Sequence, residues 1–296
     1  MPSSLSFIPF DGVLQNRWRW LAIFLFALEC TFRRTLTILL LGVAWLSALI
    51  KSMNFFMLTQ GQLDTQLLEA QGPRYFTQTI LGILELQSLW LAVILTAIGA
   101  GLIANDLKKG AYQVYFARPI QAKDYFIGKA LAVFFYAFLV IWLPMLVFWV
   151  HGFLFSGFHS SQNWQVVSGD ITIIRFAQTM AYLFILTVSM GLLILALSAW
   201  SKNSKFVGLV FIGIFLVGKF IEQLASFLQL RALSFLSYLK NFETTGRVLF
   251  DYWGEGVDPS RIPKDGYMAI VLLGILALFC IVVLYRRLKH IISFGQ

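Results

Sequence analysis

Charged residues are scarce in this sequence. Only 12% of its 296 residues are charged, whereas soluble domains carry about 25%. Hydrophobic residues make up 59% of the chain, and they gather in long runs with few interruptions. This composition predicts an integral membrane protein.

Cysteine and histidine are also rare. The two cysteines, Cys30 and Cys280, lie far apart, which excludes a disulfide framework or a paired-cysteine metal site. The three histidines form no metal-binding motif, and no catalytic triad pattern is visible. We therefore expect the chain to bind no metal or cofactor and to have no catalytic site of its own. The first 16 residues contain no Lys or Arg, so we expect no cleaved signal peptide.

Six apolar segments are long enough, or nearly so, to cross a bilayer, which takes about 20 residues as a helix. The fold class expected is all-α, with one six-span membrane domain over residues 35–285, preceded by residues 1–34 and followed by a basic tail, 286–296. The six segments are 35–55, 79–104, 125–150, 173–200, 206–228 and 267–285.

The net charge of +9 indicates topology. Basic residues collect before the first span, between the second and third, between the fourth and fifth, and in the tail. These four segments hold 14 of the 23 basic residues and four acidic ones, a net +10, and the rest of the chain sums to −1. The positive-inside rule places this side, with both termini, in the cytoplasm. Nucleic-acid binding is not expected, because no basic cluster exceeds a few residues.

The segment 18–28 is apolar but too short to span. Trp and Arg residues precede it, and these favour the headgroup region. We expect an interfacial helix that turns into the first span near Arg33 and Arg34. The alternative is one helix running unbroken from Trp18 to Ile50, which would place Glu29, Arg33 and Arg34 at membrane depth.

On the other side, the longest loop is 229–266. Its first part mixes Leu and Phe with spaced charges, which predicts short amphipathic helices at the outer surface. Glu85, Lys219 and Glu222 lie toward the outer ends of their spans and are interpreted as anchors, with Lys219 and Glu222 able to pair. The middles of the spans lack ionisable residues, which argues against a proton-coupled pump or an ion channel.

The most informative polar segment is 105–129, between the second and third spans. Leu107, Ala111 and Arg118 recur at helical spacing. We expect a short helix over 107–118 with Asp106 as its N-cap. Pro119 would end that helix, and Asp124 would cap the third span. The alternative is a solvated basic loop, although such a loop would not need aromatic residues at Tyr112, Tyr115 and Phe116.

The order of residues in this segment resembles the signature of the type-2 ABC exporter permeases. In that family an acidic residue ends the second span, followed by a Gly-Thr/Ala step, an aliphatic-aromatic stretch, Arg-Pro-Ile/Val, Tyr and Gly-Lys. The matching residues are Asp106, Gly110-Ala111, Val114-Tyr115-Phe116, Arg118-Pro119-Ile120, Tyr125 and Gly128-Lys129. Weaker similarities cover 27–34 and 198–205, and Asp106 departs from the more usual Glu.

The resemblance implies a permease without a fused ATPase, because the chain has neither a phosphate loop nor the ABC signature. A second copy or a related permease would pair with it, and two ABC ATPase subunits would use ATP and Mg. The helix 107–118 would be the coupling helix. Contacts to the ATPase would come from Asp106, Leu107, Lys108, Lys109, Gly110, Ala111, Tyr112, Tyr115, Arg118 and Pro119. Glu29, Arg33 and Arg34 would mark the approach to the first span.

The resemblance further implies an exporter in the bacterial cytoplasmic membrane, and the apolar, aromatic spans favour a hydrophobic or lipid-like substrate. Two other functions stay open. The chain could be a membrane scaffold or regulator that binds an ATPase and transports nothing. It could also be a membrane-embedded enzyme acting on lipid through His151, His159 and Asp170.

Overall fold

The computed structural model describes residues 18–59, 75–111, 122–155, 169–251 and 262–293, and every regular element in these ranges is a helix. Six helices are long and apolar enough to cross a membrane, as predicted. They are Thr35–Met57, Tyr75–Lys109, Lys123–Leu154, Ile173–Trp200, Ser204–Phe227 and Lys264–Arg287. Within the described ranges, the expected all-α fold and the six helices able to span a membrane are confirmed, which supports a multi-pass membrane protein.

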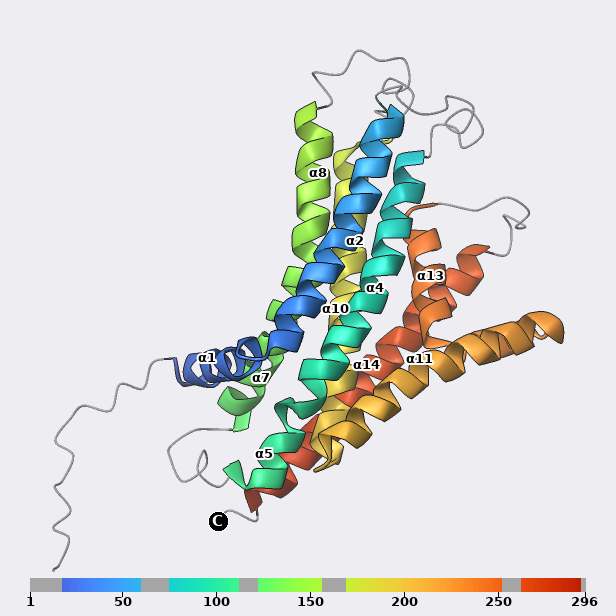
Figure 1. Ribbon diagram of the computed structural model, residues 1–296. Helices are drawn as coiled ribbons and strands as arrows, with labels where there is room; N and C mark the ends of the chain where they lie inside the picture. Colours follow the sequence, from blue (N-terminus) through green and yellow to red (C-terminus); the bar gives the residue numbers. More distant parts are fainter. Residues whose placement is uncertain (1–17, 60–74, 112–121, 156–168, 252–261, 294–296) are drawn as a thin grey trace, which may run out of the picture.

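In chain order, the spans and the helices between them carry the labels below, most of which are printed in Figure 1. They are α1 (Arg19–Phe32), α2 (Thr35–Thr59), α4 (Tyr75–Leu102), α5 (Ala104–Lys109), α7 (Ala122–Ala137), the π-helical turn η2 (Phe138–Trp142), α8 (Leu143–Phe155), α10 (Ile173–Trp200), α11 (Ser204–Phe227), α12 (Arg231–Ser234), α13 (Tyr238–Leu249) and α14 (Ile262–Ser293).

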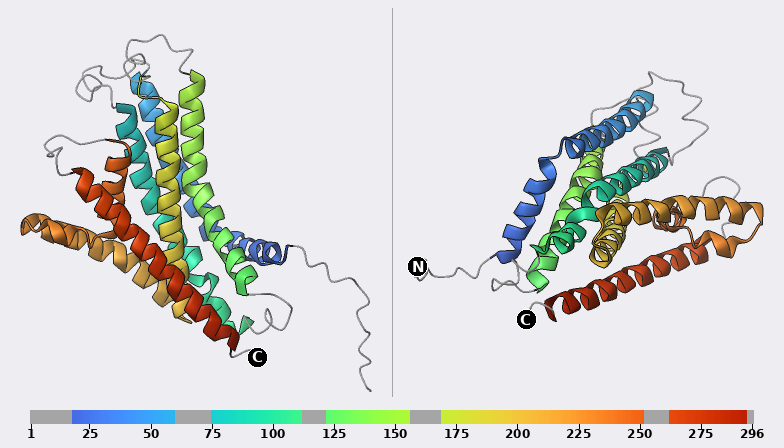
Figure 2. Two further views of the ribbon diagram at one scale, coloured as in Figure 1. Left: turned by 180° about the vertical axis from the view of Figure 1, so that it is seen from behind. Right: turned by 60° about the horizontal axis from the view of Figure 1, so that its bottom comes forward.

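The bundle has two ends. Figures 1 and 2 show α5, the beginning of α7 and the end of α14 together at one end, here called the Asp106 end. The beginnings of α4 and α10 lie at the opposite end, here called the Tyr75 end. Helix α1 also lies near the Asp106 end, at a wide angle to α2 (Figure 1).

Helices α4 and α10 form the centre of the bundle. In each, 61% of the most apolar stretch is buried, against 17% in the first span, 28% in α11 and 22% in α14. Gly99 lets the two central helices approach closely, because a Cβ at this position would lie 2.9 Å from Ile194 Cγ1. The outer helices therefore turn large apolar surfaces outward, as spans in lipid do.

Helix α13 is amphipathic, as the sequence predicts for this loop. The Ser237 hydroxyl accepts from the Lys240 N–H and caps the helix. Tyr238 and Phe242 are buried, and α13 packs against α10, α11 and α14. It thus forms part of the bundle wall beside α4 (Figure 1) instead of lying apart on the surface.

The third span bends at η2. Pro144 has no N–H to donate to the carbonyl one turn earlier, so a regular α-helix cannot continue through this point. The chain forms a wide π-turn over Phe138–Trp142 instead. The Leu139 carbonyl accepts from the Trp45 indole N–H of α2 at 3.0 Å. The bend thus fastens the third span to the first.

Helix α1 is separate from the first span. It ends at Phe32, and α2 begins at Thr35, so the alternative of one unbroken helix from Trp18 to Ile50 is wrong. Helix α1 packs along α7 through Gly128, where a Cβ would lie 2.8 Å from both the Ile23 Cβ and the Trp20 carbonyl oxygen.

Candidate functional site

The second span breaks at Ile103 as it reaches the Asp106 end. The N–H groups of Ile103 and Ala104 both donate to Ser198 Oγ of α10, each at 3.0 Å. The same hydroxyl donates to the Ala100 carbonyl at 3.0 Å. A serine hydroxyl has one proton and two lone pairs, so all its hydrogen-bonding capacity is used. Ser198 therefore does for α5 what an N-cap residue does, but from another helix.

An ion pair joins α5 to α7. Lys129 Nζ lies 2.7 Å from Asp106 Oδ2, and the two side chains are 4% and 15% exposed. Tyr125 Oη donates to the same carboxylate oxygen at 2.8 Å. The ammonium group also lies 5.5 Å from the centre of the Tyr125 ring, within range of a cation–π interaction. A buried ammonium needs such partners, so these contacts hold α5 against the third span.

Helix α7 joins α5 on one face and α1 on another. Tyr125 and Lys129 are four residues apart and share the face toward Asp106. Gly128 contacts α1, and further along, the Tyr136 hydroxyl lies 2.5 Å from the Thr31 hydroxyl of α1. Helix α7 thus contacts both α5 and α1.

Two expectations about capping are wrong. Asp106 lies inside the first turn of α5, whose N-cap is Ile103, so it does not cap a helix that starts at Leu107. Asp124 likewise lies in the first turn of α7, which includes Ala122. Both carboxylates still lie near the positive ends of helix dipoles, where negative charge is favourable.

The expected helix over 107–118 does not run unbroken. Helix α5 ends at Lys109, and Gly110 adopts a left-handed conformation with φ of 68°, a common way for a helix to stop. Leu107 is buried, whereas Lys108 and Lys109 are exposed and Gly110 and Ala111 half-buried. The remaining predicted contacts lie outside the described residues: Tyr112, Tyr115, Arg118 and Pro119.

The three charged residues before the first span separate into two groups. Glu29 and Arg33 form an exposed ion pair at 2.6 Å. Arg34 instead lines a hollow of about 280 Å³ together with Asn105 and Lys205, between α4 and α11. Within the described residues, no acidic side chain lines this hollow.

The residues considered for lipid chemistry do not converge in the described part of the chain. Asp170 Oδ2 accepts from the Thr77 N–H at 3.0 Å and from the Thr77 hydroxyl, and Asp170 Oδ1 lies 3.1 Å from Arg175 Nε. His151 contacts Phe56, with the two rings tilted at 50° and their centres 3.7 Å apart. His159 lies outside the described residues. Asp170 thus has a structural place, closing the Tyr75 end by joining α4 to α10.

Sequence reasoning did not assign the roles of Lys129 and Ser198. Lys129 lies inside an apolar run, four residues after Tyr125, so a helical projection puts both side chains on one face. That signal predicts a polar partner for the pair. Ser198 carries no comparable signal, because a single serine in an apolar span is ordinary.

Comparison with known proteins gives no match: no family model fits the chain, and no curated protein is similar to it in sequence.

Proposed function

We propose that this chain is the membrane-spanning permease subunit of an ATP-driven ABC transporter, exporting a hydrophobic or lipid-like substrate. A separate ATPase would dock at the Asp106 end and drive α5. ATP and Mg would be bound by the ATPase. The proposal is supported by the six spans and by the residue order of 106–129.

The contact of Asp106 with Lys129 and Tyr125 carries the proposal. Three residues that are separated in the motif lie together, and they join α5, which continues the second span, to the third span. A push on α5 would therefore displace both spans together as a rigid unit. Lys108 and Lys109 are exposed at this end and would offer charge to an acidic docking surface.

The distribution of charge supports a cytoplasmic place for the Asp106 end in a bacterial cytoplasmic membrane. In that frame α1 would lie along the inner leaflet, with exposed Trp18 and Phe26 toward lipid. The outward apolar surfaces of α2, α11 and α14 offer room for a second copy or a related permease as well as for lipid.

The test is co-purification. The tagged full chain is extracted from its own membrane in mild detergent, and retained proteins are identified by mass spectrometry. We expect an ABC ATPase to be retained, and Arg118→Glu to lower its amount at least about tenfold, since charge reversal opposes docking. Lys202→Glu is the matched control, an exposed cation in another connection at the same end, and should retain the ATPase.

Absence of any ATPase with the unaltered chain, or equal retention by Arg118→Glu and the unaltered chain, would overturn the proposal. A retained ATPase that hydrolyses ATP in reconstituted vesicles without moving any lipid extract component would instead support the scaffold or regulator.

A further inference from the structure

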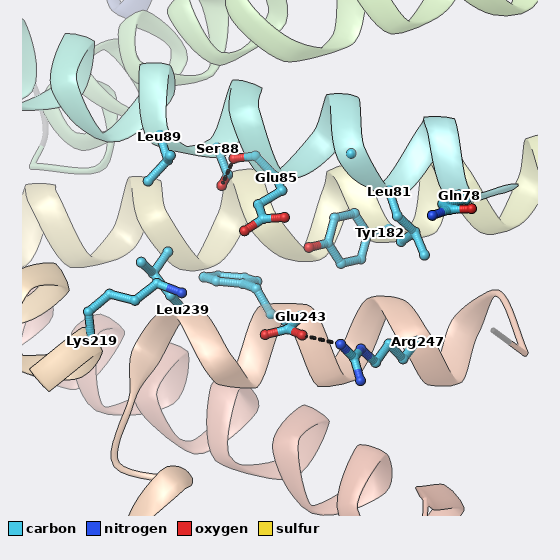
Figure 3. A pocket seen from close by; sticks show the side chains of 12 residues that line it. Gln78, Leu81, Glu85, Ser88, Leu89, Tyr182, Lys219, Leu239, Glu243 and Arg247 are labelled. Atoms are coloured by element: carbon cyan, nitrogen blue, oxygen red, sulfur yellow. Dashed lines mark hydrogen bonds and ion pairs between the residues drawn. The ribbon is translucent and has the colours of Figure 1, made fainter. Parts of the chain in front are cut away.

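A cavity with both polar and apolar walls lies toward the Tyr75 end, between α4, α10, α11 and α13. Its volume is about 420 Å³, within the range of small-molecule sites. Figure 3 shows the Glu85 carboxylate and the Tyr182 hydroxyl pointing into the space across from Glu243 and Arg247. Apolar side chains complete the wall: Leu81, Leu89, Leu239 and Phe242.

Three cations near this cavity already have carboxylate partners. Lys240 lies 3.5 Å from Glu222 and 3.0 Å from Glu243. Lys219 lies 3.3 Å from Glu222, which confirms the predicted pair, and Arg247 lies 2.5 Å from Glu243. Two acids thus serve three cations in one network across α11 and α13.

Glu85 stands outside this network. It lines the cavity, yet no ion pair joins it to any residue in the described ranges. It lies about ten residues into α4, or about 15 Å along the helix axis from Tyr75. The Glu85 side chain is exposed, so a ligand can reach its carboxylate, and an ionised group within a span is stabilised by a partner of opposite charge.

Tyr182 supplies a second polar group aimed at the same space. Its side chain is only 5% exposed, and its hydroxyl points into the cavity (Figure 3). Among the described residues this hydroxyl has no hydrogen-bond partner. Because the hydroxyl opens onto the cavity, a ligand atom or a water molecule can form a hydrogen bond with it.

The lining therefore combines the Glu85 carboxylate, the Tyr182 hydroxyl and two aromatic rings, Tyr182 and Phe242, beside the ion-paired side chains of Lys219, Glu243 and Arg247. Carboxylates and aromatic faces together recognise organic ammonium groups. The apolar wall around them, with Leu89 one turn from Glu85, suits a hydrocarbon body.

We propose that this cavity binds an amphiphilic amine, with its ammonium group on Glu85 and Tyr182 and its apolar part on Leu81, Leu89 and Phe242. The inference is independent of ATP-driven transport, because it concerns binding to this chain alone.

The experiment measures equilibrium binding of radiolabelled octylamine to the full chain in lipid nanodiscs at pH 7, with empty nanodiscs subtracted. Octanol is the neutral probe of the same length. We expect Glu85→Gln to raise the Kd for octylamine at least about tenfold and Tyr182→Phe to raise it several-fold. Binding of octanol should be weak and equal in all variants.

Glu29→Gln is the matched control, an exposed carboxylate at the opposite end of the bundle, and should leave octylamine binding unchanged. Lys219→Gln tests whether the lysine's own ammonium group occupies Glu85; octylamine binding in that variant should be unchanged or tighter.

Equal octylamine affinity in Glu85→Gln and the unaltered chain, or no binding above empty nanodiscs, would overturn the proposal. Unchanged octylamine binding in Tyr182→Phe would show that the Tyr182 hydroxyl does not contact the ammonium group. None of these outcomes depends on an ATPase. Amine binding can therefore be disproved while the transport function stands, and the transport function can be disproved while amine binding stands.

Discussion

Lys129 decides how the Asp106 end is held, because its ammonium group is almost fully enclosed and relies on Asp106 and Tyr125. In the sequence, Lys129 is a charged residue within an apolar span. In the structure, its ion pair with Asp106 joins α7 to α5. The Glu243 carboxylate likewise forms ion pairs with two cations, Lys240 and Arg247.

Removal of one partner from the buried pair should be more harmful than removal of both. We expect Asp106→Asn to lower the free energy of unfolding by about 3 kcal/mol, since it leaves Lys129 buried without its counter-charge. Adding Lys129→Met to that variant should restore part of the loss. Denaturant unfolding in detergent micelles measures all three proteins, and a double variant less stable than the single one would contradict this account.

Glu243 should make stability depend on pH. Burial alone would raise the pKa of Glu243, but Lys240, Arg247 and Lys219 hold it below the ordinary 4.5. The unfolded chain then takes up its proton at higher pH than the folded chain, so the stabilisation is present above about 4.5 and is lost as pH falls below it. Glu243→Gln should therefore be less stable at pH 7 and should lose less stability between pH 7 and pH 3.5.

The measurement is the denaturation midpoint in micelles across that range. Glu29→Gln, which removes an exposed ion pair, should follow the unaltered chain. Parallel curves for Glu243→Gln and the unaltered chain would rule out this role of the carboxylate.

At the scale of elements, α1 and α5 are each attached to the bundle by contacts that local sequence does not reveal. Helix α1 depends on the absence of a side chain at Gly128, and α5 depends on a hydroxyl from α10. Both are short, so packing against neighbours supplies their stability.

Gly128→Ala should displace α1 from α7. The added Cβ would meet the Trp20 carbonyl oxygen and Ile23 at 2.8 Å, and backbone at that distance cannot move aside without shifting the helix. We expect a loss of about 1–3 kcal/mol in stability and faster hydrogen exchange in α1. Gly82→Ala, where a Cβ has nothing within 4 Å, is the control in α4. Equal exchange in both variants would show that α1 is held elsewhere.

At the scale of the whole molecule, the uneven distribution of basic residues and the six spans predict which end of the bundle faces the outside of the cell. In a chain with Cys30→Ser and Cys280→Ala, a cysteine at Gly169 should react with a membrane-impermeant maleimide in intact cells. A cysteine at Lys108 should react only after permeabilisation, because the basic Asp106 end is expected inside. Both positions are exposed, so the opposite pattern would reverse the topology.

The spans were predictable because length and hydropathy decide membrane crossing locally. The pairing of Lys219 with Glu222 was also predictable from local sequence, because residues three apart lie on one face of a helix. The N-cap role assigned to Asp106 was wrong because α5 begins earlier, at Ala104, where Ser198 of α10 accepts from the N–H groups of Ile103 and Ala104. The end of α5 at Gly110 could have been foreseen, since Lys108-Lys109-Gly110 is a typical helix C-terminus.

The π-turn at Phe138–Trp142 divides the third span into two stretches with different angular phases. One additional residue in a turn advances the side chains that follow by about 100°. A single helical wheel drawn through the whole span would therefore assign the wrong neighbours to one half of it. The residues of α7 that face α1 and the residues of α8 that face α2 do not lie on one continuous stripe. A comparison of this span with a regular α-helix has to count one residue more on this chain before the two patterns coincide.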